Sequence, residues 1–222
     1  MKRLIIARHG NTFRPGETPT RVGAGTDLPL VEETRARSIG RYLKDKGLTP
    51  DRVLAAPLKR TMQTAALALE EAGLSLPIFP MEDFREIDYG PDENKTEDEV
   101  MERLGRLACP AEASHDEIMA KGREAIELWN ANGTVPSGWR VDPAELAAVW
   151  KKFAADIRDG ETVLVVSSNG VIRFAPHITE GYDDFCAQYD IKTATGGVCI
   201  FENAGGIWEC REWNVKPFKM YA

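Results

Sequence analysis

The sequence has few of the residues from which metal sites and disulfide frameworks are built. It contains four cysteines and three histidines in 222 residues. The cysteines form no CxxC pair, and no histidine lies at metal-ligand spacing from them. A zinc site and a dense disulfide framework are therefore not indicated, and we expect reduced thiols in a cytoplasmic protein that uses no metal and no other cofactor.

Long apolar runs and an excess of positive charge are also missing. The apolar run at 4–7 is too short for the core of a signal peptide, and no later segment approaches the length of a membrane span. The net charge of −7, from 35 acidic and 28 basic residues, would repel a nucleic-acid backbone or an anionic membrane. We therefore expect neither as a partner, and a small anionic substrate would need a locally basic pocket.

What the sequence does contain is an alternation of short apolar segments and helical patterns. Strands are predicted at 2–7, 52–56, 76–79 and 162–167, helices at about 31–46, 57–72, 143–159 and 170–180, and a closing hairpin around Gly205 and Gly206. Strands that alternate with helices imply crossover connections and parallel pairing. We predict an α/β fold, a three-layer α/β/α sandwich with a mostly parallel sheet.

The segment 91–141 departs from this alternation. It opens with the acidic stretch "PDENKTEDEV", continues with short helical patterns, and is broken at Gly133, Pro136 and Gly138. We predict that residues 1–222 form a single domain in which 91–141 is a helical cap insertion over the sheet. Trp129 and Trp139 in this segment are either core residues or part of a substrate pocket.

Polar side chains follow the strands at three places where parallel strands would end together. "LIIARHGNT" supplies Arg8 and His9, "AAPLKRTMQTA" can place Arg60 on the first turn of a helix, and "VVSSNGVIR" follows the strand at 162–167. Ligands of open α/β sheets bind beyond the carboxyl ends of the strands. Two guanidinium groups beside one imidazole suit a phosphoryl group, because each guanidinium can hold two oxygens while an imidazole nitrogen attacks the phosphorus.

Four motifs together resemble the histidine phosphatase superfamily, with its phosphoglycerate-mutase-like fold: "ARHGNT", "LPL" at 28–30, "APLKRTMQTA" and "FREIDYG" at 84–90. The resemblance implies that His9 is the phosphorylated nucleophile, that Arg8 and Arg60 bind the phosphoryl oxygens, and that Glu86 donates a proton to the leaving alcohol. The further pocket residues that it implies are Asn11, Thr12 and Arg21. A proton donor at neutral pH would need burial or neighbouring carboxylates to raise the pKa of Glu86.

The sequence also departs from the family pattern. Most members have a second histidine in the phosphate pocket, and this sequence has Ser168 at that place, followed by Asn169. A serine donates one hydrogen bond but carries no charge, so electrostatic stabilisation of the phosphoryl group should fall. Ala56 replaces a family serine, "PDENK" replaces the usual tryptophan and glycine, and Pro15 stands where mutases have an asparagine.

Each candidate residue also has an interpretation that needs no site. Arg60 suits a helix surface, and Glu86 lies in a region crowded with solvated acids. Ser168 and Asn169 are typical helix caps, and that role alone explains their residue types. Both interpretations of each residue stay open at this point.

The sequence favours a metal-independent phosphatase that hydrolyses a small phosphomonoester through a phosphohistidine at His9. One alternative is a weakly active or inactive family member that binds a phosphorylated metabolite or a protein partner, because Ser168 replaces a histidine. A phosphoglycerate-mutase-type phosphotransferase is less favoured, since its motif residues are incomplete here. The substrate is not identified, and the oligomeric state is open, with a homodimer as one option.

Overall fold

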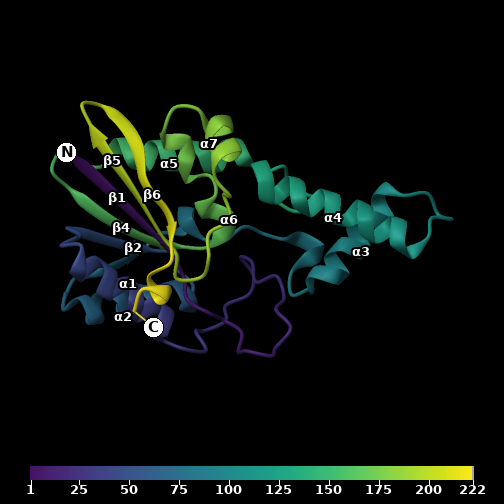
Figure 1. Cartoon of the computed structure of the whole chain (residues 1–222), viewed down its shortest axis with the longest axis horizontal. Coiled ribbons are helices and arrows are strands. Elements are labelled where there is room, and N and C mark those ends of the chain that lie inside the picture. Colours follow the sequence, from purple (N-terminus) through teal and green to yellow (C-terminus); the bar gives the residue numbers. More distant parts are fainter. Residues whose placement is uncertain (222) are drawn as a thin grey trace.

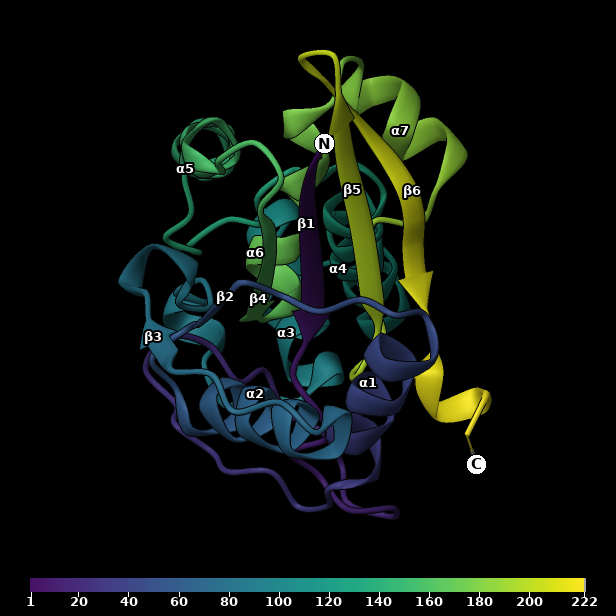
Figure 2. The ribbon, with the colours of Figure 1, turned by 90° about the vertical axis from the view of Figure 1, so that its left-hand side faces the viewer.

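The computed structural model describes residues 1–221, whose strands form one six-stranded mixed sheet with the order β3-β2-β4-β1-β5-β6. The strands are β1 (Lys2–Arg8), β2 (Arg52–Ala55), β3 (Ile78–Pro80), β4 (Thr162–Ser167), β5 (Val198–Ala204) and β6 (Ile207–Val215). The first four pair in parallel, and β5 and β6 add an antiparallel hairpin. Figure 2 shows β1 between β4 and β5.

Helices cover both faces of the sheet, as the sequence predicted. The helices are α1 (Thr34–Asp45), α2 (Lys59–Ala72), α3 (Glu97–Ala108), α4 (His115–Asn132), α5 (Pro143–Asp156), α6 (Asn169–Ile172) and α7 (Tyr182–Gln188). Four short 3₁₀ helices accompany them: η1 (Glu82–Phe84), η2 (Gly90–Asp92), η3 (Ala175–Ile178) and η4 (Pro217–Lys219). None of the helices in residues 1–221 combines the length and the apolarity that a membrane crossing requires.

Alternate residues of the central strands supply the two halves of the core. Ile5 and its neighbours on one face pack with the apolar sides of α1 and α2, while Leu4 and Ile6 pack on the other face with Trp150 and Phe174. Side chains of a strand alternate between faces, so a strand that is covered on both sides must be apolar throughout. This explains the uninterrupted apolar run that precedes Arg8.

The prediction of one continuous helix at 170–180 is wrong. The structure has the short helix α6, then the 3₁₀ helix η3, and a separate helix α7 that the sequence pattern did not indicate. Pro176 lacks an N–H group, and its ring clashes with the carbonyl four residues earlier, so a continuous α-helix cannot pass through this position. The helix at 143–159 is confirmed with an earlier end, and the Asp142 carboxylate caps it by accepting from the amides of Ala144 and Glu145.

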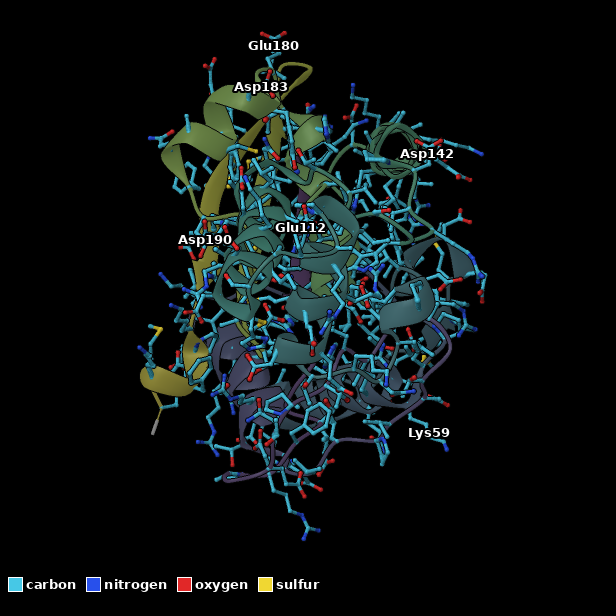
Figure 3. The ribbon with its side chains drawn as sticks, turned by 90° about the vertical axis from the view of Figure 1, so that its right-hand side faces the viewer. Lys59, Glu112, Asp142, Glu180, Asp183 and Asp190 are labelled. Carbon is cyan, nitrogen blue, oxygen red and sulfur yellow. The ribbon has the colours of Figure 1, made fainter. Side chains whose placement is uncertain are left out.

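The segment 91–141 contributes α3 and α4, which form a hairpin that extends away from the sheet (Figure 1). Both helices begin with a capping box. The backbones of the two helices approach each other closely at Gly105, where a Cβ would lie 1.8 Å from the Ile118 carbonyl oxygen. Glu112, in the connecting turn, lies near the centre of the view from that end (Figure 3). The role of this hairpin as a cap stays a prediction.

Candidate active site

A cavity of about 610 Å³ is lined by the segments that follow β1 and β4 and by the base of the α3–α4 hairpin. Its chemically relevant lining residues are Arg8, His9, Asn11, Thr12, Arg21, Glu86, Tyr89, Trp129, Asn130, Asn169, Arg173, Lys192 and Thr195. Most of the residues that the sequence singled out therefore meet in one place. The parallel register of β1 with β4, which pairs Arg8 with Ser167, brings the two strand ends together.

His9 is buried at the end of β1 in a form suited to nucleophilic attack. Its Nδ1 lies 2.7 Å from the carbonyl oxygen of Gly10. A carbonyl only accepts, so Nδ1 carries the proton and Nε2 keeps its lone pair. Burial, followed by the positive charges of Arg8 and Arg60, holds the pKa of His9 well below its usual range. The imidazole is therefore neutral at neutral pH, as a nucleophile must be.

Arg8 lines the cavity beside His9 and has unused donors. One of its Nη atoms donates to the carbonyl of Thr193 at 2.5 Å, and its buried Nε has no hydrogen-bond partner in residues 1–221. Burial lowers the pKa of Arg8, while Glu86 and Tyr89 raise it. An unpaired buried donor is costly, and an anion in the cavity would satisfy it.

Arg60 lies on the first turn of α2 and is fully buried, so the interpretation as a helix-surface charge is wrong. Its Nη1 donates to the carbonyl of Thr26 at 2.7 Å, and Nη2 to that of Gly23 at 3.3 Å. Its Nε has no partner among the described residues. The Arg60 side chain is not among those that line the cavity. Its charge nevertheless acts on both His9 and Glu86.

Glu86 is buried as well, with 6% of its surface exposed, which excludes the interpretation as a solvated acid. Its Oε1 accepts from the amide of Ile87 at 2.9 Å, and its Oε2 from the amide of Gly170 at 3.4 Å. Burial raises the pKa of Glu86 above its usual value, against the lowering effects of Arg60, the two backbone bonds and Arg8. The cavity thus contains a carboxyl group whose pKa is raised, the direction of shift that a general acid requires.

Ser168 and Asn169 differ in their access to the cavity. Ser168 is fully buried, its hydroxyl has no partner within the described part of the chain, and it does not line the cavity. Asn169 lines the cavity, and its Oδ1 accepts from the amide of Thr193 at 2.8 Å. Ser168 occupies the N-cap position of α6, as the cap interpretation expects, but its side chain makes no capping hydrogen bond, and Asn169 is the first residue of the helix. The amide nitrogen of Asn169 is the donor that remains for a ligand.

The remaining predicted residues lie on the loop after β1. The side-chain oxygen of Asn11 accepts from the Thr195 hydroxyl at 2.6 Å, and Thr12 lines the cavity nearby. The guanidinium of Arg21 lies over the rings of Trp139, at 4.9 Å, and Tyr89, at 5.6 Å. All three residues therefore line the cavity.

Sequence reasoning did not assign several residues that form the site. Tyr89 and Arg173 lie inside the motifs "FREIDYG" and "VVSSNGVIR", so position within a motif was an available signal. The segment 192–195 binds Arg8, Asn11 and Asn169 through its threonines, and its sequence "KTAT" gives no comparable signal. Trp129 lines the cavity, while Trp139 packs behind it with the two rings 5.2 Å apart.

The charges of the cavity suit an anionic ligand. Its lining carries five basic side chains (Arg8, Arg14, Arg21, Arg173 and Lys192) against three acids (Glu86, Glu97 and Asp98), and burial raises the pKa of Glu86, the acid beside His9 in the site. Over residues 1–221, no group of three or more His, Cys, Asp or Glu side chains is arranged to hold a metal ion.

Comparisons with known proteins agree with this geometry. The family model of the histidine phosphatase superfamily (branch 1) matches residues 4–216. A 2,3-bisphosphoglycerate-dependent phosphoglycerate mutase of Methylobacterium sp. (strain 4-46) is 36% identical over 191 residues, which are 80% of each chain.

Two solved structures share the fold. The structure of Bacillus stearothermophilus YhfR has a TM-score of 0.70 at 23% identity, covering 98% of this chain and 100% of that one. A phosphoserine phosphatase of Entamoeba histolytica, in complex with 3-phosphoglyceric acid, has a TM-score of 0.70 at 17% identity, covering 98% and 99%. With the family model matching nearly the whole chain, the protein belongs to the histidine phosphatase superfamily.

Proposed function

We propose that this protein is a phosphomonoesterase that acts on a small phosphorylated substrate through a phosphohistidine at His9. One observation carries the proposal: a neutral imidazole, held through Nδ1, is buried next to two arginines and in one cavity with a carboxyl group of raised pKa. This set supplies a nucleophile, an anion-binding charge and a general acid for phosphoryl transfer.

In the first step the lone pair of His9 Nε2 attacks the phosphorus, and the bond from phosphorus to the alcohol oxygen breaks. Glu86 gives its proton to the departing oxygen, so that an alcohol leaves instead of an alkoxide. Arg8 binds the phosphoryl oxygens, and the side-chain amide of Asn169, which follows the neighbouring strand β4, supplies a neutral hydrogen bond. The products are the free alcohol and a phosphate group on Nε2.

In the second step water attacks the phosphorus and the phosphorus–nitrogen bond breaks. The Glu86 carboxylate, left ionised by the first step, takes a proton from the water. Inorganic phosphate leaves, and His9 returns to its neutral form with the proton on Nδ1. No step of this sequence calls for a metal ion or a redox cofactor.

Two other functions are supported by particular observations. The 36% identity to a phosphoglycerate mutase supports a phosphotransferase, which would pass the phosphate back to a substrate hydroxyl instead of to water. The uncharged pair Ser168 and Asn169, together with the use of Arg60 donors on loop carbonyls, supports a weakly active member that mainly binds a phosphorylated ligand.

Release of inorganic phosphate tests the three functions. The wild type should hydrolyse p-nitrophenyl phosphate and form an acid-labile phosphoenzyme, and His9→Ala should lose both. His115→Ala is the matched control, because His115 is exposed at the start of α4, outside the cavity. Equal rates in the wild type and His9→Ala would exclude the phosphohistidine. Interconversion of 2- and 3-phosphoglycerate without phosphate release would establish a mutase instead.

A further inference from the structure

Glu93 belongs to the segment "PDENK", which departs from the family pattern and which the proposed reaction does not use. Its side chain is half-buried between η2 and α3. One carboxylate oxygen, Oε1, accepts two hydrogen bonds, from the amide of Gly23 at 3.0 Å and from the hydroxyl of Thr26 at 2.5 Å. Glu93 therefore holds a loop that lies 67–70 residues earlier in the chain, the loop 22–26.

The same loop encloses the guanidinium group of Arg60. Nη1 of Arg60 donates to the carbonyl of Thr26 at 2.7 Å, and Nη2 donates to the carbonyls of Gly23, at 3.3 Å, and Val22, at 3.4 Å. Gly23 and Thr26 thus donate to Glu93 and accept from Arg60. Because Arg60 is fully buried, the position of its guanidinium group depends on where these carbonyls lie.

The loop is packed tightly on both sides. A Cβ at Gly23 would clash with the Glu93 carboxylate and would lie 2.7 Å from the carbonyl oxygen of Ile87. The amide of Ala24 donates to that same carbonyl at 2.9 Å, and the amide of Ile87 donates to Glu86. The loop is therefore fixed between Glu93 on one side and the segment of the proposed general acid on the other.

The charge of Arg60 acts on the site although its side chain does not line the cavity. Burial lowers the pKa of His9, and the charges of Arg8 and Arg60 lower it further. Burial raises the pKa of Glu86, and Arg60 is the first of the groups that oppose this effect. The ionisable groups that act on Arg60 itself are Glu86, Tyr89, Asp27 and Glu93. A displacement of Arg60 would therefore be felt at both reacting groups.

We propose that Glu93 is a positioning residue, whose carboxylate fixes the loop 22–26 so that the loop carbonyls fix Arg60 beside His9. Glu93 does not line the cavity, so it acts through the loop and not on a ligand. The use of the Arg60 charge in phosphoryl transfer rests on the proposed function. The link from Glu93 to Arg60 rests only on the hydrogen bonds and on the close packing of the loop.

A titration of the histidines by nuclear magnetic resonance tests this link without turnover. The chain has three histidines, and the signal that His9→Ala removes is that of His9. Glu93→Ala should raise the pKa of His9, because water solvates a guanidinium group released by the loop and screens its charge. Glu93→Gln should leave this pKa unchanged, since both hydrogen bonds from the loop end on one oxygen, which a glutamine amide retains.

Hydrolysis of p-nitrophenyl phosphate gives a second readout. Glu93→Ala should lower kcat about 10-fold and leave KM within about threefold, because the Arg60 charge acts on the reacting groups from outside the cavity lining. In an Arg60→Met background, Glu93→Ala should change neither kcat nor the pKa of His9 any further. The matched control is Glu124→Ala, at an exposed pair on α4, and it should behave as the wild type.

Thr26→Val is the milder variant if Glu93→Ala fails to fold. It removes the hydroxyl that donates to Glu93 and keeps the shape of the side chain. The pKa of His9 should rise and kcat should fall, as in Glu93→Ala but by smaller amounts. Thr26→Ser retains the hydroxyl and should behave as the wild type.

An unchanged pKa of His9 in Glu93→Ala, or in Thr26→Val where that variant replaces it, overturns the proposal. Equal effects of Glu93→Gln and Glu93→Ala also overturn it, because Glu93 would then act by its charge. A further loss caused by Glu93→Ala in the Arg60→Met background would mean that Glu93 acts by another route. A raised pKa of His9 that glutamine restores, in a protein that releases no phosphate, keeps the positioning role and removes the phosphatase.

Discussion

Replacing Gly170 by alanine tests whether Glu86 donates its proton from the position that the structure gives it. A Cβ at Gly170 would lie 2.4 Å from Glu86 Oε1 and 2.7 Å from Ile87 Cγ1, whereas such contacts in proteins stay above 3.0 Å. The carboxyl group or the backbone beside it must therefore move by more than half an ångström. Overpacking of this kind costs about 1–3 kcal/mol of unfolding free energy. A misplacement of about 1 Å costs roughly 100-fold in rate.

The leaving group distinguishes a displaced acid from general damage to the site. An alkyl phosphate needs a proton on its departing oxygen, while p-nitrophenolate leaves readily without one. Gly170→Ala should therefore lower kcat about 100-fold on glycerol 3-phosphate and only a few-fold on p-nitrophenyl phosphate. The matched control is Gly25→Ala, whose Cβ would lie 3.7 Å from Glu93 Oε1, an ordinary contact. An equal loss of kcat on both substrates, or no loss on either, would refute the idea that Glu86 donates the proton from its position beside Gly170.

Three further substitutions have expected outcomes. Because the folded protein holds the pKa of Glu86 above its unfolded value, the contribution of Glu86 to wild-type stability should fall as pH rises above about 4.5. The unfolding free energy of Glu86→Gln minus that of the wild type should therefore increase with pH in urea unfolding; a constant difference would contradict the raised pKa. Arg103→Met should lower the free energy of unfolding by about 3–5 kcal/mol, because it leaves the buried Asp92 carboxylate without its cationic partner. The control Arg106→Met removes an exposed ion pair on the same helix and should lower it by at most about 1 kcal/mol. Similar losses for the two variants in urea unfolding would refute this. Ser168→His should lower stability by about 1–3 kcal/mol without raising kcat on p-nitrophenyl phosphate, because the serine is fully buried outside the cavity lining; a large gain in kcat would mean that the missing histidine limits the site.

The sequence predicts those parts of the fold and the site that local pattern and strand ends determine. A strand that is apolar on both faces must lie between two layers, and the first polar residues after it must emerge at the carboxyl edge. This reasoning places Arg8 and His9 correctly, because the register of β1 with β4 leaves them at that edge. Similarly, an arginine two residues into a helix after β2 was expected near the same edge, and Arg60 is buried there.

The remaining features depend on contacts between distant segments, for which the local sequence carries no signal. Thr193 accepts from Arg8, which precedes it by 185 residues, and its amide donates to Asn169. The guanidinium group of Arg60 donates hydrogen bonds to backbone carbonyls of a loop that lies 34–38 residues earlier in the chain. Arg173 differs from these cases, because it lies inside the motif "VVSSNGVIR", but its contact with the carbonyl of Trp129 joins segments 44 residues apart and has no signal in the local pattern.

The placement of Glu86 among arginines couples its protonation to the binding of an anion. Burial raises the pKa of Glu86, while the charges of Arg60 and Arg8 lower it. In the proposed mechanism, a phosphoryl group at His9 would be bound by Arg8, would compensate the arginine charge and would add a negative charge of its own, and both effects would raise the pKa of Glu86 further. We therefore expect the carboxyl group to hold its proton most tightly in the substrate complex, the state in which the proposed reaction needs one for the leaving oxygen. Release of phosphate should then lower the pKa again, so that under the proposed mechanism the protonation of Glu86 follows the binding and release of the anion.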